Sequence, residues 1–322
     1  MRPLIISRIT REAEGVLGLL LCSPDGADLP AYAAGAHVDV KLGNGLIRQY
    51  SLCGDPADRG VYRLGVGLAS DSRGGSRHIH DTLREGDLLA VGEPRSLFGL
   101  HPQAGAHHFI AGGIGITPIL SMIFACEQRG ESWTLLYCAR SRKHAAFLNE
   151  LSAHANRLRL HFDDEQGGAR CDLDPHLTGV LQPGSHVYCC GPGPLMDAVA
   201  LACERQCLPA AQLHVERFSL AGAEAATETS AADPNSGFTL VLARSGGSYH
   251  VPAGKSVLEV LEAAGIAWPH ACREGLCRSC EAGVLSGQVD HRDYVLSDEE
   301  RAANRSMMVC VSRSCGTLEL DV

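Results

Sequence analysis

The 322-residue sequence predicts a multidomain fold: an antiparallel β-barrel, a doubly wound α/β domain and a small β-grasp domain. Three observations lead to this prediction. Short apolar runs separated by turns fill roughly the first hundred residues, strand and helix patterns alternate over the next stretch, and the last part opens with a hairpin and a helix. A chain of this length has room for two or three domains.

The composition excludes several classes of protein. Lys and Arg number 28 against 37 Asp and Glu, so the net charge of −9 lacks the basic excess that nucleic-acid binding requires. The 14 cysteines are too sparse for a disulfide scaffold and favour a reduced, cytoplasmic chain in which some ligate metal. Residues 96–126 carry no Asp, Glu, Lys or Arg. Three glycines and Pro118 interrupt this run, which favours buried elements over a membrane span.

Residues 1–103 carry the barrel pattern, with expected strands inside 36–42, 62–68 and 87–93 and one helix from about Ser76 to Arg84. Residues 104–222 show the α/β alternation. Strands are expected at 107–112, 133–139, 157–162, 186–191 and 212–216, and helices near 117–129, 143–154 and 194–206. Thr117 as N-cap, Pro118 at the first helical position and Gly130 after the end frame the first helix.

Residues 223–236 are expected to be a linker, because they are polar, rich in Ala and Ser, and nearly free of large apolar residues. Residues 237–322 form the third domain. A hairpin is expected around Gly246, and two helices open with capping boxes, Ser256 with Glu259 and Ser297 with Glu300. This domain holds eight basic and eleven acidic residues, and its mildly acidic surface could meet a basic patch on a partner.

Cysteine spacing gives the strongest functional signal. Cys272, Cys277 and Cys280 read C-x4-C-x2-C, and Cys310 follows, which is the spacing of plant-type [2Fe–2S] clusters. Zinc prefers paired C-x2-C knuckles, and only one pair fits that form. A Rieske centre needs His ligands close to Cys, and no C-x-H occurs. Cys315 competes with Cys310 as the fourth ligand, and Cys310 is preferred because its neighbours are apolar.

These residues also carry a family resemblance, in ACREGLCRSCEAGVLSG and the following MMVCVSR. They resemble the ferredoxin domain of the phthalate dioxygenase reductase family, which includes vanillate demethylase reductase subunits. The resemblance covers essentially the whole chain and implies the order flavin barrel, NAD domain, ferredoxin. Where the family usually has Gly after the second ligand, this chain has Arg278, and we expect that cation to raise the reduction potential of the cluster.

The motif Arg48-Gln49-Tyr50-Ser51 is similar to the family's R-x-Y-S motif at the flavin. Arg48 is suited to gripping a phosphate, Tyr50 to covering the isoalloxazine ring and Ser51 to hydrogen bonding near the N5 edge. Taken alone, the motif also fits a solvated strand face. Further residues are expected to hold the cofactor: Gly74, Gly75 and Ser76 as a phosphate seat at a helix start, and Gly65 and Val66 against the ring, as the family implies. The resemblance implies FMN rather than FAD, although the sequence does not settle that choice.

The nicotinamide site is expected at two loops. The run from Gly112 to Pro118 follows an apolar strand and is similar to the GGxGxTP loop of ferredoxin–NADP reductase-like modules, which assigns Gly113, Gly115 and Thr117 to the cofactor. The run Cys190-Gly191-Pro192 resembles the C-G-P signature, in which Cys190 positions the nicotinamide and is not a nucleophile; a buried thiol at a strand end is the alternative.

Phe218 is expected either to shield the flavin face or simply to pack at the domain end. The family usually prefers NADH, although Arg140, Arg142 and Lys143 could hold a 2′-phosphate. Histidine pairs such as His107/His108 lack a further ligand at matching spacing, so core or surface roles are expected for them.

Together these sites imply an electron path. A nicotinamide gives up two electrons as a hydride, a [2Fe–2S] cluster accepts one, and a flavin holds zero, one or two, so it stands between them. The resemblance implies that the acceptor is a terminal Rieske-type oxygenase acting on an aromatic acid, contacted transiently by a monomeric reductase. Cytochrome P450 or another soluble acceptor is the alternative. Two further alternatives are a redox sensor and a self-contained hydroxylase. The hydroxylase is disfavoured because the sequence shows no other metal-binding motif.

Overall fold

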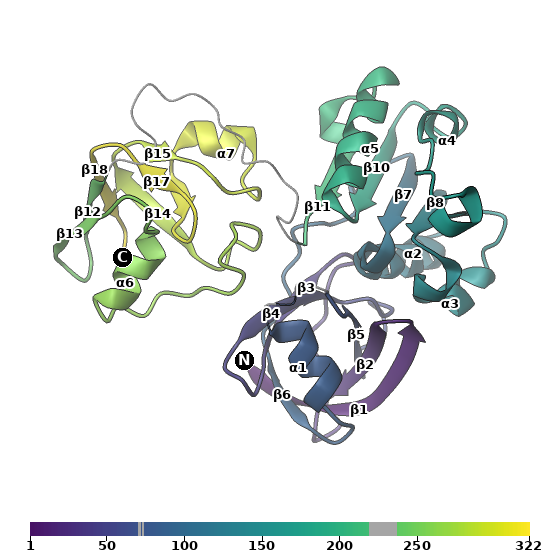
Figure 1. Cartoon of the computed structure of the whole chain (residues 1–322), viewed down its shortest axis with the longest axis horizontal. Helices are drawn as coiled ribbons and strands as arrows, with labels where there is room; N and C mark the ends of the chain where they lie inside the picture. Colours follow the sequence, from purple (N-terminus) through teal and green to yellow (C-terminus); the bar gives the residue numbers. More distant parts are fainter. Residues whose placement is uncertain (70–71, 73, 219–236) are drawn as a thin grey trace. The chain divides into compact units, whose positions relative to one another are not determined.

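The computed structural model describes residues 1–69, 72, 74–218 and 237–322, which fall into two compact units, Met1–Phe218 and Ser219–Val322. Figure 1 shows three regular regions along the chain: a barrel, an α/β domain and a smaller mixed domain. The predicted fold class is therefore confirmed. Among the described residues, no helix is both long and apolar enough to cross a membrane.

The first region is an antiparallel six-stranded sheet in the order β4-β3-β6-β1-β2-β5. A bridge between Leu52 and Leu64 joins the two outer strands and closes the sheet into a barrel. Alternate residues of the strands fill its core, including Leu19, Leu21 and Val38. The elements are β1 (Arg2–Ala13), β2 (Val16–Cys22), β3 (His37–Lys41), β4 (Ile47–Ser51), β5 (Tyr62–Gly67), α1 (Gly75–Thr82) and β6 (Leu88–Val91).

The second region is a five-stranded sheet in the order β11-β10-β7-β8-β9, with every strand parallel to its neighbour. Its strands are β7 (Ala106–Gly112), β8 (Trp133–Ala139), β9 (Leu158–Phe162), β10 (Ser185–Cys190) and β11 (Leu213–Glu216). All five strands predicted from the sequence are present. The chain order reverses between β7 and β10, and this switch point is where α/β sheets bind ligands.

The helices of this region differ from the prediction in two places. Helix α2 (Ile116–Arg129) begins one residue early, so its N-cap is Gly115, and the Thr117 hydroxyl instead donates to the Ile114 carbonyl oxygen at 2.9 Å. The helix expected over 143–154 is broken, because Phe147 adopts a φ of 61°. Its place is taken by η2 (Arg142–His144) and α3 (Leu148–Ser152). The others are η1 (Gly113–Gly115), η3 (Asp163–Gln166), α4 (Asp174–Thr178), α5 (Gly193–Arg205) and η4 (Ala210–Gln212).

Strand β5 of the barrel packs directly against the α/β domain. A Cβ atom on Gly65 would lie 2.5 Å from Cγ2 of Thr117 and 3.1 Å from Cζ of Phe147, so only a glycine allows this approach. Arg63 of the same strand forms ion pairs of 2.6 Å with Glu150 and 2.9 Å with Glu12. These contacts hold the two regions together as one unit.

The second unit has a five-stranded sheet in the order β13-β12-β18-β14-β16, with β12 and β18 parallel, and helix α6 beside it, as in a β-grasp fold. Both predicted capping boxes are present, at Ser256 with Glu259 and at Ser297 with Glu300. The elements are β12 (Phe238–Leu242), β13 (Ser248–Val251), α6 (Val257–Ala263), β14 (Glu281–Ser286), β15 (Val289–Asp290), α7 (Asp298–Ala303), β16 (Ser306–Met308), β17 (Arg313–Ser314) and β18 (Thr317–Leu320).

Candidate functional site

The four predicted cluster cysteines converge in the second unit. Cys272, Cys277 and Cys280 lie on the irregular loop between α6 and β14, and Cys310 lies in the turn that follows β16. The thiol of Cys272 contacts those of Cys277 and Cys310, and the Cys310 thiol also contacts Cys280. Strand β16 ends at Met308, and the turn that follows aims the Cys310 thiol at the loop. Cys315, the other candidate, is exposed.

The loop backbone fits a cluster of anionic sulfur atoms. The amide of Glu274 donates to the sulfur of Cys272 at 3.3 Å, that of Leu276 also contacts Cys272, and that of Gly275 contacts Cys310. Such amide donors stabilise negative charge on sulfur. Gly275 has a φ of 70°, and a Cβ there would lie 2.7 Å from Cγ2 of Val311, so the tight path needs glycine.

Crowding of the thiols has an electrostatic consequence. Contact with Cys272, together with burial, raises the pKa of the Cys277 thiol well above its ordinary value. Two thiolates this close repel each other unless a cation neutralises them. Binding of iron by this loop must therefore release protons, as thiolate sites do in general.

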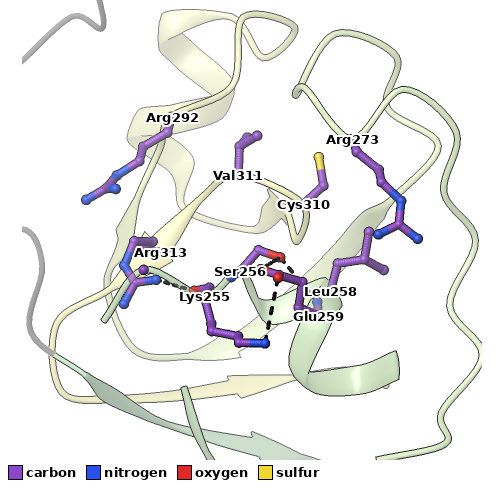
Figure 2. Close-up of a pocket in the computed structure, with 10 residues that line it drawn as sticks. Lys255, Ser256, Leu258, Glu259, Arg273, Arg292, Cys310, Val311 and Arg313 are labelled. Carbon is purple, nitrogen blue, oxygen red and sulfur yellow. Dashed lines mark hydrogen bonds and ion pairs between the residues drawn. The ribbon is translucent and has the colours of Figure 1, made fainter. Parts of the chain in front are cut away.

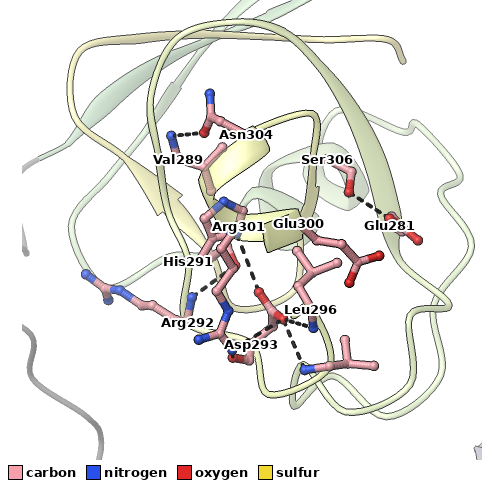
Figure 3. A network of polar contacts seen from close by, with 12 residues as sticks. Glu281, Val289, His291, Arg292, Asp293, Leu296, Glu300, Arg301, Asn304 and Ser306 are labelled. Carbon is pink, nitrogen blue, oxygen red and sulfur yellow. Dashed lines mark hydrogen bonds and ion pairs between the residues drawn. The ribbon is translucent and has the colours of Figure 1, made fainter. Parts of the chain in front are cut away.

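A second layer of polar contacts supports the loop from behind (Figure 3). The buried Asp293 carboxylate accepts hydrogen bonds from the amides of Val295 and Leu296, at 3.1 and 2.8 Å. Its backbone fills the space beside Gly275, and the amide of the next residue, Tyr294, donates to the Gly275 carbonyl oxygen at 3.0 Å. This network holds the loop in place at Gly275.

Arg278 adopts a φ of 55°, which explains why glycine suits this position. Its guanidinium forms ion pairs of 3.0 Å with Glu281 and 2.8 Å with Glu300. The two carboxylates outweigh the cation, so Arg278 does not act on the cluster as an isolated positive charge. Its role is better described as screening Glu281 and Glu300.

A pocket of about 370 Å³ opens beside Cys310. Figure 2 shows Cys310 between Arg273 on one side and Arg292 and Arg313 on the other. The cations are paired: Arg273 with Glu262, Arg292 with Asp290 at 2.7 Å, and Lys255 with Glu259 at 3.9 Å. Arg313 lies over the Phe238 ring and bonds backbone carbonyl oxygens. Four cations against three carboxylates leave this face slightly positive, unlike the unit as a whole.

In the barrel, the structure brings the predicted phosphate-binding residues together. Arg48 lies on β4, and a Cβ on Gly75 would lie 2.7 Å from its Cγ and 2.8 Å from its Nε, so the arginine crosses the start of α1. Gly74, the N-cap of α1, has a φ of 85°. A helix N-terminus beside a guanidinium is suited to an anion, which fits the phosphate of a flavin mononucleotide.

The other predicted flavin residues lie nearby. Tyr50 is half-buried on the same strand as Arg48, and Ser51 at the end of that strand is buried. The Ser76 hydroxyl sits in the first turn of α1 and donates to that of Ser72 at 3.0 Å. Val66 points into the barrel core, so only its backbone could face a ligand, and its carbonyl oxygen lies 2.9 Å from Nε2 of His80.

At the switch point, the two nicotinamide loops pack on each other. A Cβ on Gly115 would lie 2.1 Å from the carbonyl oxygen of Cys190, and one on Gly191 would lie 2.9 Å from Cα of Gly112. These glycines therefore serve close packing. Gly113 differs, because its φ is 54° and a Cβ there would meet open space. Of the loop glycines, Gly113 is the one with a face available to a phosphate.

The remaining predicted residues show separate environments. Cys190 is fully buried at the end of β10, and burial raises the pKa of its thiol, which argues against a nucleophile and fits either a positioning role or a packing role at the strand end. Pro192 caps the start of α5, and Thr117 is buried against Gly65. Phe218, at the end of the unit, is 40% exposed, which leaves its ring available to stack.

Sequence reasoning missed Glu216, the last residue of β11, which pairs in register with Cys190. Burial raises the pKa of its carboxyl to about 8, and its Oε2 has no hydrogen-bond partner among the described residues. No motif marks this glutamate in the sequence. Only the pairing of β11 with β10 shows that it lies beside the C-G-P loop.

The cations that could select a 2′-phosphate are largely engaged. Arg142 stacks on Phe162 and forms an ion pair of 3.4 Å with Glu165, and Lys143 forms one of 3.0 Å with Glu14. Arg140 is exposed at the end of β8. These pairings favour a cofactor without a 2′-phosphate.

Comparisons with known proteins agree with this arrangement. A "2Fe-2S iron-sulfur cluster binding domain" model matches residues 241–315, and an "Oxidoreductase NAD-binding domain" model matches residues 109–200. The chain is 44% identical to "Phenoxybenzoate dioxygenase subunit beta" of Ectopseudomonas oleovorans, over 98% of this chain and 96% of that protein.

Two solved structures are similar over the whole chain. One is that of phthalate dioxygenase reductase, 38% identical with a TM-score of 0.73 and 98% of its chain covered. The other is a self-sufficient cytochrome P450 monooxygenase, 41% identical with a TM-score of 0.87, of which this chain matches 41%. The protein is thus an oxidoreductase with NAD-binding and [2Fe–2S] domains. It belongs to the phthalate dioxygenase reductase family.

Glu216, a partly exposed residue whose carboxyl oxygen Oε2 is buried, predicts a pH-dependent stability. Folding favours the neutral carboxyl, so its contribution is complete below about pH 4.5 and is lost as the pH rises towards 8. Glu216→Gln is the size of the neutral form and does not ionise. We expect its thermal unfolding midpoint to gain on that of the wild type as the pH rises through this range. A gap that stays constant with pH, or an equal gain for exposed Glu204→Gln, would contradict the assignment.

The ion-pair trio predicts opposite shifts of cluster potential. Arg278→Gly exposes two carboxylates, which we expect to lower the reduction potential. Glu300→Gln removes one negative charge and preserves the capping box, which we expect to raise the potential. Redox titration of both variants measures this. An unchanged or higher reduction potential in Arg278→Gly would show that Arg278 does not screen the charges of Glu281 and Glu300.

Proposed function

We propose that this chain is the reductase component of a multicomponent, Rieske-type oxygenase. It takes electrons from NADH and passes them, through FMN and a [2Fe–2S] cluster, one at a time to a terminal aromatic-acid oxygenase or demethylase. One observation carries the proposal: a convergent four-thiol loop and an NAD-binding domain lie on a chain that matches a dioxygenase subunit over nearly its full length.

The residues of this chain bind the cofactors and orient them. When bound, the flavin supplies the two-electron to one-electron conversion that no side chain here can perform. Arg48 and the start of α1, with Gly74, Gly75 and Ser76, hold its phosphate, while Tyr50, Ser51 and the backbone at Gly65 and Val66 border its ring. The likeness to the phthalate dioxygenase reductase family supports FMN over FAD.

For the nicotinamide, Gly113 offers the open backbone to the pyrophosphate, while Gly115, Thr117, Gly191 and Pro192 build the packed floor beneath it. Cys190 and Phe218 orient the ring. Engaged cations near β8 support NADH as the preferred donor. Cys272, Cys277, Cys280 and Cys310 ligate the cluster.

The partner contact is proposed to be transient. The slightly positive face beside Cys310 borders the cluster site, so it suits carboxylates on the oxygenase. This revises the expectation of an acidic face meeting a basic partner. The chain is proposed to act as a cytoplasmic monomer, with domains at 1–103, 104–222 and 237–322 and a linker at 223–236, which lies outside the described residues. Its 14 cysteines form no disulfide in the structure, which supports a reducing compartment.

A cytochrome P450 is the second candidate acceptor. It is favoured by the 41% identity to the corresponding part of a self-sufficient P450 monooxygenase. NADH-driven oxygen uptake with purified oxygenases or P450 proteins, each with its substrate, distinguishes the two candidates.

The cluster ligands and the electron outlet can be tested with paired serine variants. We expect Cys310→Ser to lose its iron and its cytochrome c reduction while keeping NADH-dependent reduction of ferricyanide, because the first unit is untouched. Cys315→Ser, exposed and five residues on, is the matched control and should keep all three. Iron per chain and the two rates are measured. Loss of iron in Cys315→Ser alone would reassign the ligand, and full cytochrome c reduction by iron-free Cys310→Ser would refute the outlet.

A further inference from the structure

A cluster of metal-ligating side chains lies in the first unit, away from both cofactor sites. It begins at the end of α2, where Gly130 takes a φ of 66° and the amide of Glu131 donates to the Cys126 carbonyl oxygen at 2.9 Å. This hydrogen bond from Glu131 to the residue five before it is the Schellman motif that ends many helices. It folds Glu131 back beside Cys126, and the Cys126 thiol contacts the Glu131 carboxylate.

The third member comes from the neighbouring strand. The amide of His107, near the start of β7, donates to the Ser132 carbonyl oxygen at 2.9 Å, so the segment after α2 is tied to β7. The His107 Nε2 atom lies 3.3 Å from Oε2 of Glu131. One nitrogen, one sulfur and one oxygen atom, from His107, Cys126 and Glu131, all lie within 4.8 Å of one another.

The 3.3 Å separation of the His107 nitrogen and the Glu131 oxygen fits two ligands of one tetrahedral ion. With Zn–N and Zn–O bonds of about 2.0–2.2 Å, two ligands of a tetrahedral zinc lie roughly 3.3–3.5 Å apart. His107 and Cys126 are buried, at 2% and 0% exposure. The Glu131 Oε2 atom is buried and lacks a hydrogen-bond partner among the described residues, while Oε1 faces Arg129 at 3.7 Å. The neighbours of this carboxylate are an imidazole nitrogen and a thiol, so three atoms that can each ligate a cation face one another in a buried place.

We propose that His107, Cys126 and Glu131 bind one Zn²⁺ ion. The donor set is one that zinc accepts, and a thiolate, a carboxylate and a neutral imidazole together balance its two positive charges. Charge balance matters because the site is largely closed to solvent. Three protein ligands leave the fourth tetrahedral position to a water molecule.

The location indicates a structural role. His107 stands near the amino end of β7, whereas the glycine loop follows Gly112 at its carboxyl end, so the ion would lie at the opposite edge of the sheet from the nucleotide. Its ligands come from β7, α2 and the segment before β8. Zinc would cross-link the C-terminal end of α2 to strand β7 of the sheet.

Zinc content of the purified holoprotein tests this assignment. The protein must carry two iron atoms per chain, because a four-cysteine loop without its cluster would also take up zinc. The protein is incubated with Zn²⁺, dialysed into metal-free buffer and analysed for zinc and iron by plasma mass spectrometry, with thermal unfolding recorded with and without Zn²⁺. The variants are Cys126→Ser, Glu131→Gln and, as a control, Cys203→Ser, which alters another buried helical cysteine.

We expect about one zinc per chain and a zinc-dependent rise in unfolding temperature in the wild type and in Cys203→Ser. Both signals should be lost in Cys126→Ser and in Glu131→Gln. Because Glu131 is partly exposed, Glu131→Gln should fold even if a change at Cys126 does not. A wild type that retains no zinc, or a Glu131→Gln variant that retains as much as the wild type, would overturn the proposal.

Discussion

The second unit is organised around four thiols in contact, three from one irregular loop and the fourth, of Cys310, from the turn after β16. Their mutual repulsion as thiolates is tolerable only around a cation, so the loop is built for metal. The loop turns at Gly275, where no side chain fits, and the backbone of Asp293 packs against that turn. The Asp293 carboxylate is itself held by backbone amides. The β-grasp sheet and α6 provide the frame that delivers Cys310 from the far end of the unit.

Glycine packing plays the equivalent part in the first unit. Gly112, Gly115 and Gly191 let the two switch-point loops touch, and Gly65 lets the barrel touch α2. One set of close contacts therefore positions the flavin-side strand, the pyrophosphate loop and the C-G-P loop relative to one another. The surfaces that we propose for binding are left free by this packing: the open face of Gly113, the exposed ring of Phe218 and the start of α1 beside Arg48.

Local signals in the sequence predicted much of this. Ser256 and Glu259 form their capping box from a four-residue pattern, and the parallel strands follow from apolar runs. Two predictions were wrong because tertiary contacts override local signals: Thr117 as an N-cap and a single helix over 143–154. Thr117 packs against Gly65, and Phe147 adopts a left-handed backbone conformation where it packs. Glu216 could not be predicted, since only strand pairing brings it beside Cys190. The trio of His107, Cys126 and Glu131 could not be predicted either, because it forms only when the end of α2 packs against β7.

The central claim is that the two units work in series, with a flavin between nicotinamide and cluster. Anaerobic titration of the holoprotein with NADH, followed by visible absorbance and electron paramagnetic resonance, tests it most directly. If the flavin passes electrons to the cluster, each chain takes up about three electrons with no added mediator, two on the flavin and one on the cluster. A cluster that stays oxidised after the flavin is fully reduced would contradict it.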